Sequence, residues 1–338
     1  MFGRGVLDGL AGSAFIADVD ARDRVALRIV GAVAGGFIVG AVAAIAAMIL
    51  LLALYVLVSG RGAEGLAGIT NLLIGLRDEK AASLSSTLLQ LILDTGVNLA
   101  FALAFVATAA VIFSRHFRVF VTIAARFRWR LVVSGVALSI IVLAPIFIVD
   151  RFVTAPPSAI PLIAISPDWL QRLGYLLTAV LFIPAAAAEE LVFRGWLLRQ
   201  TAAFVRRPLL LLLATGFLFA VMHLDFNPDS LLTRTLMGAG FAYMTLRLGG
   251  IEFSIGAHAA NNMLIMLLIQ PLTLQLPRQT SAISAFSLIE DAVLIAGYIL
   301  ITEAVVRLPT LARWSGLRPE EITASAAFPP QGVAGPPR

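Results

Sequence analysis

A long uncharged run near the start of the chain constrains the fold more than any other feature. No charged side chain occurs from Ile29 to Gly60. At 1.5 Å per residue, such a helix exceeds the ~30 Å hydrocarbon core of a bilayer, so it must tilt or protrude. The run is too long for the apolar core of a cleaved signal peptide, and it is preceded by Asp8, Asp18, Asp20 and Asp23 instead of a basic leader. We therefore expect a retained first transmembrane helix.

The composition of the whole chain agrees with a membrane location. Hydrophobic residues make up 59% of the 338 residues, and charged residues make up only 13%. So little polar surface could not cover a soluble globule. The apolar runs predict an all-α, polytopic membrane helical bundle with about eight transmembrane helices. We place these spans at 29–60, 86–113, 131–149, 170–200, 208–224, 231–247, 251–270 and 286–306.

The arginines between the spans predict the orientation of the chain. They concentrate after spans two, four and eight: Arg115, Arg118, Arg126, Arg128, Arg130, Arg199, Arg206, Arg207, Arg307, Arg313 and Arg318. Eight crossings place these connections and both termini in the cytoplasm, as the positive-inside rule requires. A net charge of +5 in such connections indicates an anionic membrane face and argues against nucleic acid as a partner. We expect segment 114–130 to be a basic cytoplasmic loop or interfacial helix.

The scarcity of cysteine and histidine narrows the possible chemistry. The chain has no cysteine, which excludes disulfides, iron–sulfur clusters, thiolate zinc sites and cysteine nucleophiles. It has three histidines, of which His116 falls in the arginine-rich segment and is most simply a solvated side chain. The other two lie within predicted spans. An ionisable group there is costly unless it is paired or hydrated, so it indicates function.

The first intramembrane polar group is the sequence EELVFRG at 189–195. Glu190 and Arg194 stand at i and i+4 with the acid first, the favourable order for a helical ion pair. Glu189 points about 100° away around the helix and lacks such a partner, which suits a proton acceptor in apolar surroundings. A charge cluster at a helix end, without a catalytic role, would explain these residues equally well.

His223 closes the fifth predicted span in the pattern Phe219-x-x-x-His223. A single histidine at a helix end is more often structural than catalytic. Spans four and five, however, would form a hairpin that turns near Arg206 and Arg207, so residues whose numbers sum to about 412 lie at equal depth. Glu189 and His223 satisfy that sum. The hairpin therefore predicts a carboxylate opposite an imidazole inside the membrane.

The third polar group is His258 with Asn262 in span seven, on one helical face at i and i+4. Both can donate hydrogen bonds to a developing negative charge, and a polar face that joins helices is the alternative. If span seven begins at the polar break Gly249-Gly250, His258 lies less deep in the membrane than His223. The two histidines can then meet only if span seven begins earlier, is broken or is tilted. Four other polar residues lie near span ends, where we expect them to reach the interface: Arg234, Glu290, Asp291 and Glu303.

Glu189, His223, His258 and Asn262 together supply a carboxylate, two imidazoles and an amide. This set suits the addition of water to an amide, because one group can take the proton while others hold the oxyanion. The sequence contains no G-x-S-x-G, H-E-x-x-H or Gly-rich phosphate-binding motif. Ser254 lies near His258, but nothing singles it out as a nucleophile.

The three motifs, in this order on separate apolar helices, resemble those of the CPBP family of intramembrane proteases. This family includes the type 2 CAAX prenyl proteases and bacteriocin-processing-like Abi proteins. The similarity covers about 175–270. It implies an eight-helix endopeptidase that cleaves a membrane-associated protein or peptide, with its site below the cytoplasmic face of a bacterial cell membrane.

The resemblance also implies a role for each motif residue. Glu189 and His223 would activate the attacking water, and His258 and Asn262 would stabilise the oxyanion. Two further residues would order the site: Glu190 and Arg194. A zinc site formed by Glu189, His223 and His258 is the alternative. We prefer a metal-free mechanism with no cofactor, because asparagine is a poor zinc ligand and Asn262 is placed as a donor.

These expectations divide the chain into four parts. A cytoplasmic N-terminal segment (1–28) is followed by a first group of transmembrane helices (29–165), which contains the basic loop 114–130. The catalytic core (166–306) and a largely disordered cytoplasmic tail (307–338) complete the chain. The expected partners are the substrate and the lipid bilayer, and the sequence indicates no oligomeric state. A rival interpretation is a non-catalytic membrane scaffold or immunity protein that binds a partner through the basic cytoplasmic surface. It would keep the fold and need none of the four side chains for chemistry.

Overall fold

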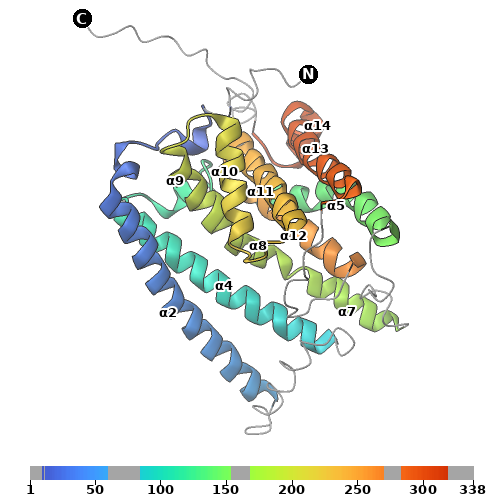
Figure 1. Ribbon diagram of the computed structural model, residues 1–338. Coiled ribbons are helices and arrows are strands. Elements are labelled where there is room, and N and C mark those ends of the chain that lie inside the picture. The colour runs from blue at the N-terminus through green and yellow to red at the C-terminus, as the bar shows by residue number, and fades with distance from the viewer. Residues whose placement is uncertain (1–9, 11, 60–83, 154–167, 270–282, 319–338) are drawn as a thin grey trace, which may run out of the picture.

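The computed structural model describes residues 10, 12–59, 84–153, 168–269 and 283–318, which are mostly helical and contain no strand (Figure 1). The helices are α2 (Ala26–Ser59), α4 (Leu84–Ile112), α5 (Trp129–Val153), α7 (Trp169–Ala179), α8 (Phe182–Glu190), α9 (Leu198–Ala202), α10 (Pro208–Val221), α11 (Pro228–Leu248), α12 (Glu252–Leu264), α13 (Ala285–Arg307) and α14 (Pro309–Trp314). The predicted all-α, polytopic bundle is confirmed. Most of the predicted disordered tail, 319–338, lies outside the described residues.

Within the described ranges, six helices are long and apolar enough to cross a membrane: Ala26–Val58, Thr87–Ile112, Trp129–Val153, Trp169–Ala202, Glu252–Ile269 and Ala285–Arg307. The chain is therefore an integral, multi-pass membrane protein, but the predicted count of eight spans is not confirmed. Helix α10 is apolar but has only 14 residues. Helix α11 is not among the six and carries charged residues along its length. Its second half is buried inside the protein, so its side chains need not be apolar enough to face lipid.

Helices α11 and α12 form the centre of the bundle, and the turn between them is buried as well. Every residue from 237 to 261 is buried. Segment 115–128 covers the turn: Ile123 N donates to Gly249 O at 2.9 Å, and Ile251 N donates to Val121 O at 2.9 Å. Helix α12 begins at Glu252, so an earlier start is wrong. His258 reaches the depth of His223 because this turn lies inside the protein.

The basic segment 114–130 is mostly an irregular loop that packs against the bundle. It contains one short 3₁₀ turn, η4 (Phe117–Phe120), and then pairs with the α11–α12 turn. Arg115 turns inward and binds Asp18 and Asp23 of the N-terminal segment. The aspartates that precede the first span therefore neutralise part of the basic surface that the sequence predicted.

Glycines allow two helix pairs to approach closely. A Cβ atom at Gly216 of α10 would lie 2.2 Å from Thr235 O of α11, and one at Gly256 of α12 would lie 2.1 Å from Val132 O of α5. Small residues at such crossings let transmembrane backbones touch. Both contacts involve the helices that carry the predicted polar motifs, so they set how closely those motifs meet.

The fourth apolar run is one long span with two irregularities. It breaks between α7 and α8, and a π-helical segment, η5 (Leu191–Leu197), joins α8 to α9. A second π-helical segment, η6 (Ile265–Ile269), follows α12. Such π segments are common at functional sites because the extra residue in the turn re-aims side chains. Arg194 lies within η5.

Candidate active site

A buried carboxylate joins two of the predicted motifs. Glu190, which is 0% exposed, accepts hydrogen bonds at Oε1 from Arg194 Nη1 and from His258 Nδ1, both at 2.9 Å. The ion pair between Glu190 and Arg194 predicted from the i, i+4 spacing is confirmed. The bond to His258 connects α8 with α12.

Aromatic rings and a backbone carbonyl complete the surroundings of Arg194. Its guanidinium carbon lies 4.3 Å from the ring centre of Phe219 and 5.1 Å from that of Phe241. Its Nη2 donates to Gly238 O at 3.1 Å. A buried charge is costly unless its hydrogen bonds are satisfied, so this enclosure holds Arg194 in one position. The sequence pattern gave no indication of Phe241 or Gly238.

Glu189 faces the two imidazoles that the sequence singled out. Its Oε2 lies 3.9 Å from His223 Nε2 and 3.9 Å from His258 Nε2, and its side chain is 35% exposed. The hairpin between α8 and α10 thus places Glu189 and His223 at equal depth, as predicted. A separation of 3.9 Å is too long for a direct hydrogen bond but suits a single bridging water.

The outer contacts of both histidines fix the direction of their rings. His223 Nδ1 lies 2.9 Å from Phe219 O, and His258 Nδ1 lies 2.9 Å from Glu190 Oε1. A carbonyl and a carboxylate can only accept, so Nδ1 carries the hydrogen in both rings. In the neutral rings, both Nε2 lone pairs therefore face Glu189.

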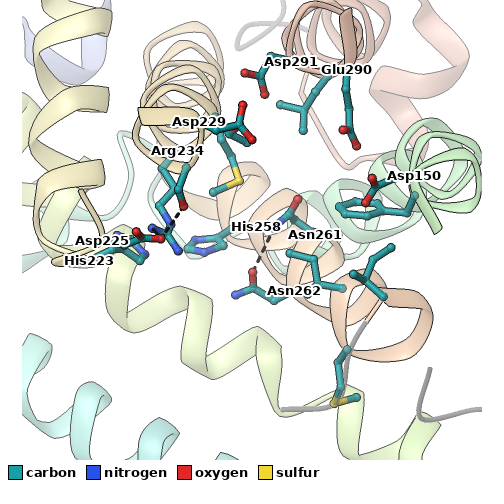
Figure 2. Close-up of a pocket in the computed structure, with 18 of the residues that line it drawn as sticks. Asp150, His223, Asp225, Asp229, Arg234, His258, Asn261, Asn262, Glu290 and Asp291 are labelled. Carbon is teal, nitrogen blue, oxygen red and sulfur yellow. Dashed lines mark hydrogen bonds and ion pairs between the residues drawn. The ribbon is translucent and has the colours of Figure 1, made fainter. Parts of the chain in front are cut away.

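Asn262 presents an amide donor to the same pocket. Asn261 Nδ2 donates to Asn262 Oδ1 at 3.3 Å, which fixes the orientation of the Asn262 amide. The Asn262 Nδ2 group is then turned away from Asn261. Figure 2 shows both asparagines beside His258 on α12.

These side chains line one cavity of about 700 Å³. All four residues predicted to act in catalysis contribute to its wall: Glu189, His223, His258 and Asn262. The remaining wall comes from the start of α8, the end of α5, the α10–α11 connection, the first half of α11, segment η6 and residues 290–294 of α13 (Figure 2). A volume of this size accommodates several residues of an extended peptide.

Arg234, Glu290 and Asp291, which we expected near the membrane interface, all line this cavity. Asp291 is only 3% exposed. Glu303 is buried as well, and its Oε1 accepts a hydrogen bond from Arg247 at 2.7 Å. The rule that intramembrane charges indicate function could have identified Arg234, Glu290 and Asp291 as site residues. Their positions near span ends instead favoured an assignment to the membrane interface.

The connection that carries His223 is held by its own ion pair. Arg234 Nη1 and Ser230 Oγ donate to Asp225 Oδ2 at 2.8 and 2.6 Å. Burial would raise the pKa of Asp225, but these hydrogen bonds outweigh it and keep that pKa below its usual value. Leu224, between His223 and Asp225, has φ 54°, a left-handed conformation that is unfavourable for leucine. The surrounding contacts maintain this strained turn.

The described residues include no group of three or more His, Asp or Glu side chains arranged to hold a metal ion. The alternative zinc ligands Glu189, His223 and His258 fit poorly as placed. Their facing atoms are 3.9 Å apart. Two ligands bound at ~2.0–2.2 Å to one tetrahedral zinc ion would be roughly 3.4 Å apart.

Comparisons with known proteins identify the region that holds these motifs. Residues 171–264 match the family model described as type II CAAX prenyl endopeptidase Rce1-like, which confirms the resemblance to CPBP proteases. Over 169 residues the chain is 32% identical to "Uncharacterized protein YyaK" of Bacillus subtilis (strain 168), covering 47% of this chain. The match covers 54% of that curated relative, about half its length. No solved structure matches the chain significantly.

Proposed function

We propose, from the match of residues 171–264 to the type II CAAX prenyl endopeptidase family, that this chain is an intramembrane endopeptidase. It hydrolyses a peptide bond of a membrane-associated protein or peptide, with water activated by Glu189 and His223. One observation carries the proposal: in the wall of the cavity, Glu189 Oε2 lies 3.9 Å from the Nε2 atoms of both His223 and His258.

The attacking water sits between Glu189 and His223. It donates one hydrogen to the Glu189 carboxylate and the other to His223 Nε2, so its oxygen lone pair points at the substrate. As the oxygen bonds to the carbonyl carbon, its proton passes to Glu189 and the carbonyl oxygen becomes an oxyanion. The same proton then moves to the amide nitrogen, the C–N bond breaks, and a carboxyl and an amine leave.

The oxyanion is held by the opposite wall of the pocket. Asn262 Nδ2 donates one hydrogen bond, and the Nε2 of His258, in its imidazolium form, donates another. Glu189 and Glu190 lie on either side of His258, 3.9 and 2.9 Å from its two ring nitrogens. Fixed donors of this kind stabilise the transition state more than the substrate.

Glu190 and Arg194 order the site without touching the reacting atoms. Glu190 fixes the ring of His258 through Nδ1, and Arg194 fixes Glu190. The mechanism uses only side chains of this chain and requires no cofactor. The poor fit of the three candidate ligands to tetrahedral zinc supports that preference.

The rival scaffold role loses its main argument. It depends on a basic cytoplasmic surface, yet three of the arginines concerned turn inward. Arg115 and Arg199 bind Asp18, and Arg128 binds Glu252 at 2.8 Å. The cationic surface left for a partner is correspondingly smaller.

We also propose that both termini lie in the cytoplasm of a bacterial cell. Contacts gather the arginine-rich connections at one end of the bundle: Arg24 Nε donates to Ala203 O at 2.8 Å, and Ser13 Oγ to Leu246 O at 2.5 Å. The cavity lies toward the opposite ends of α5 and α10. With cytoplasmic termini, the cavity lies nearer the other side of the membrane, which differs from the position that the family resemblance implies.

The test uses the full chain in lipid nanodiscs with a degenerate library of membrane-soluble peptides in which every residue type, charged ones included, occurs at the central positions. Newly formed amino termini are identified by mass spectrometry. Wild type and Asp20→Asn, a substitution at the far end of the bundle, should generate new termini. Glu189→Gln should generate none. Cleavage by Glu189→Gln at the wild-type rate would remove Glu189 as the base.

A further inference from the structure

We propose that the cavity contains a subsite for a cationic side chain of the substrate, lysine or arginine. Asp229, Glu290 and Asp291 form this subsite, which we call the acidic wall. The inference rests on the proposed peptidase function and specifies its substrate class: a peptide with a basic residue near the scissile bond.

The charges around the cavity are strongly unbalanced. Six carboxylates line it against one guanidinium, that of Arg234: Asp150, Glu189, Asp225, Asp229, Glu290 and Asp291. Arg234 is already engaged by Asp225 at 2.8 Å, and Glu189 faces the two histidines. The lining residues therefore supply no further cation for the acidic wall.

Asp291 provides the second observation that points to a ligand. It is more than nine-tenths buried and lines the cavity. Its Oδ2, however, has no hydrogen-bond partner among the described residues, and neither does Asp229 Oδ1. Buried acceptors without donors are costly, so a guest that brings N–H groups to them gains their full hydrogen-bonding energy.

Helix ends do not explain all of these carboxylates. Asp229 lies in the first turn of α11, where an acid is favoured by the helix dipole. Glu290 and Asp291 lie beyond the first turn of α13, where that effect has faded. Two adjacent acids from α13 that line the same cavity as an acid from α11 need another reason.

The spacing favours an organic cation over a metal ion. No three of the described carboxylates converge closely enough to coordinate one metal. A guanidinium or ammonium group binds carboxylates at ~2.8 Å from each nitrogen, so it can bridge acids that stand farther apart. Figure 2 shows Asp229, Glu290 and Asp291 across the cavity from His258 and Asn262. One peptide can therefore span both regions.

The test measures binding without catalysis. Two degenerate pools of apolar peptides, identical except for a fixed central arginine or citrulline, are incubated with the Glu189→Gln protein in nanodiscs of neutral lipid. Citrulline keeps the shape of arginine but lacks its charge. We expect retention of the arginine pool about tenfold or more above the citrulline pool, the size of one charge-assisted hydrogen bond.

Adding Asp291→Asn or Glu290→Gln should reduce this ratio toward one, while adding Asp20→Asn should leave it unchanged. Equal retention of both pools by Glu189→Gln overturns the subsite. The subsite is also overturned if submillimolar Ca²⁺ or Mg²⁺ displaces the arginine peptides and Asp291→Asn abolishes that displacement, because this result indicates a metal site. A retained arginine preference in a protein whose wild type cleaves nothing would refute the peptidase function and leave the subsite intact.

Discussion

Glu190 Oε1 and His258 Nδ1 lie 2.9 Å apart although 68 positions separate them in the chain. This one contact ties α8 to α12 and directs the other nitrogen of His258 toward Glu189. It also gives two neighbouring glutamates opposite environments, since Glu190 is enclosed and Glu189 faces the cavity. The following predictions begin from that contrast.

Glu189→Gln should abolish cleavage with little change in stability. The amide cannot accept the proton of the water, which costs roughly 10²–10⁴ in rate. Glu189 makes no direct hydrogen bond in the described structure, so the thermal midpoint in detergent should stay close to that of wild type. A large loss of stability together with activity would show that Glu189 is structural.

Glu190→Ala should instead destabilise the protein by about 3–5 kcal/mol, because it leaves the buried Arg194 charge unpaired. Denaturant titration in mixed micelles, followed by tryptophan fluorescence, measures this. The double substitution Glu190→Leu with Arg194→Met removes both charges and should recover much of the loss. If the double variant is no more stable than Glu190→Ala, the ion pair is not the source of the effect.

Gly216→Ala should disturb the site from a distance. The added methyl would meet Thr235 O at 2.2 Å, forcing α10 and α11 apart at a cost of about 1–3 kcal/mol. Because these helices carry His223 and the carbonyl of Gly238, activity should fall as well. Gly31→Ala is the matched control, since its methyl meets Ile112 at an ordinary 3.7 Å. Equal thermal midpoints for the two variants would contradict the close approach.

The Asp225–Arg234 pair should stabilise the protein at neutral pH and lose its effect in acid. The folded pKa of Asp225 is lowered below 3.8, so its stabilisation is present above that value and disappears as pH falls through the folded pKa. The difference in thermal midpoint between wild type and Asp225→Asn should be constant from neutral pH to about pH 5 and then shrink in stronger acid. A difference in thermal midpoint that grows as the pH falls would contradict a lowered pKa of Asp225 in the folded protein.

The absence of cysteine makes the orientation easy to test. Phe204 and Phe226 are 59% and 63% exposed, at opposite ends of α10. With cytoplasmic termini, a membrane-impermeant maleimide added to intact cells should label Phe226→Cys but label Phe204→Cys only after permeabilisation. The reverse pattern would place the arginine-rich end outside.

Local spacing predicted two of the contacts in the site, the Glu190–Arg194 ion pair and the approach of Glu189 to His223. The Glu190–Arg194 pair follows from helical geometry, and the proximity of Glu189 and His223 follows from the length of a hairpin. The contact of Glu190 with His258 could not be obtained this way, because it depends on how α12 packs against α8. Sequence spacing carries no information about that arrangement.

The depth of α12 and the acidic wall escaped prediction for a shared reason. Both arguments assumed that polar breaks and span ends lie at the membrane surface. The turn at Gly249 and Gly250 is buried under segment 115–128, and Asp291 faces a cavity within the bundle. Where protein encloses the ends of short helices, hydropathy no longer reports depth.

The hydrogen bond from Ser13 Oγ to Leu246 O spans 233 positions and has a consequence for biosynthesis. Its donor is translated 233 positions before its acceptor, which emerges only with the end of α11. The amino-terminal segment must wait, undocked, while most of the helices insert. The segment can bind Arg199 and Leu246 only after these residues are in place. In truncated or misinserted chains it would therefore stay unbound and accessible to quality-control proteases.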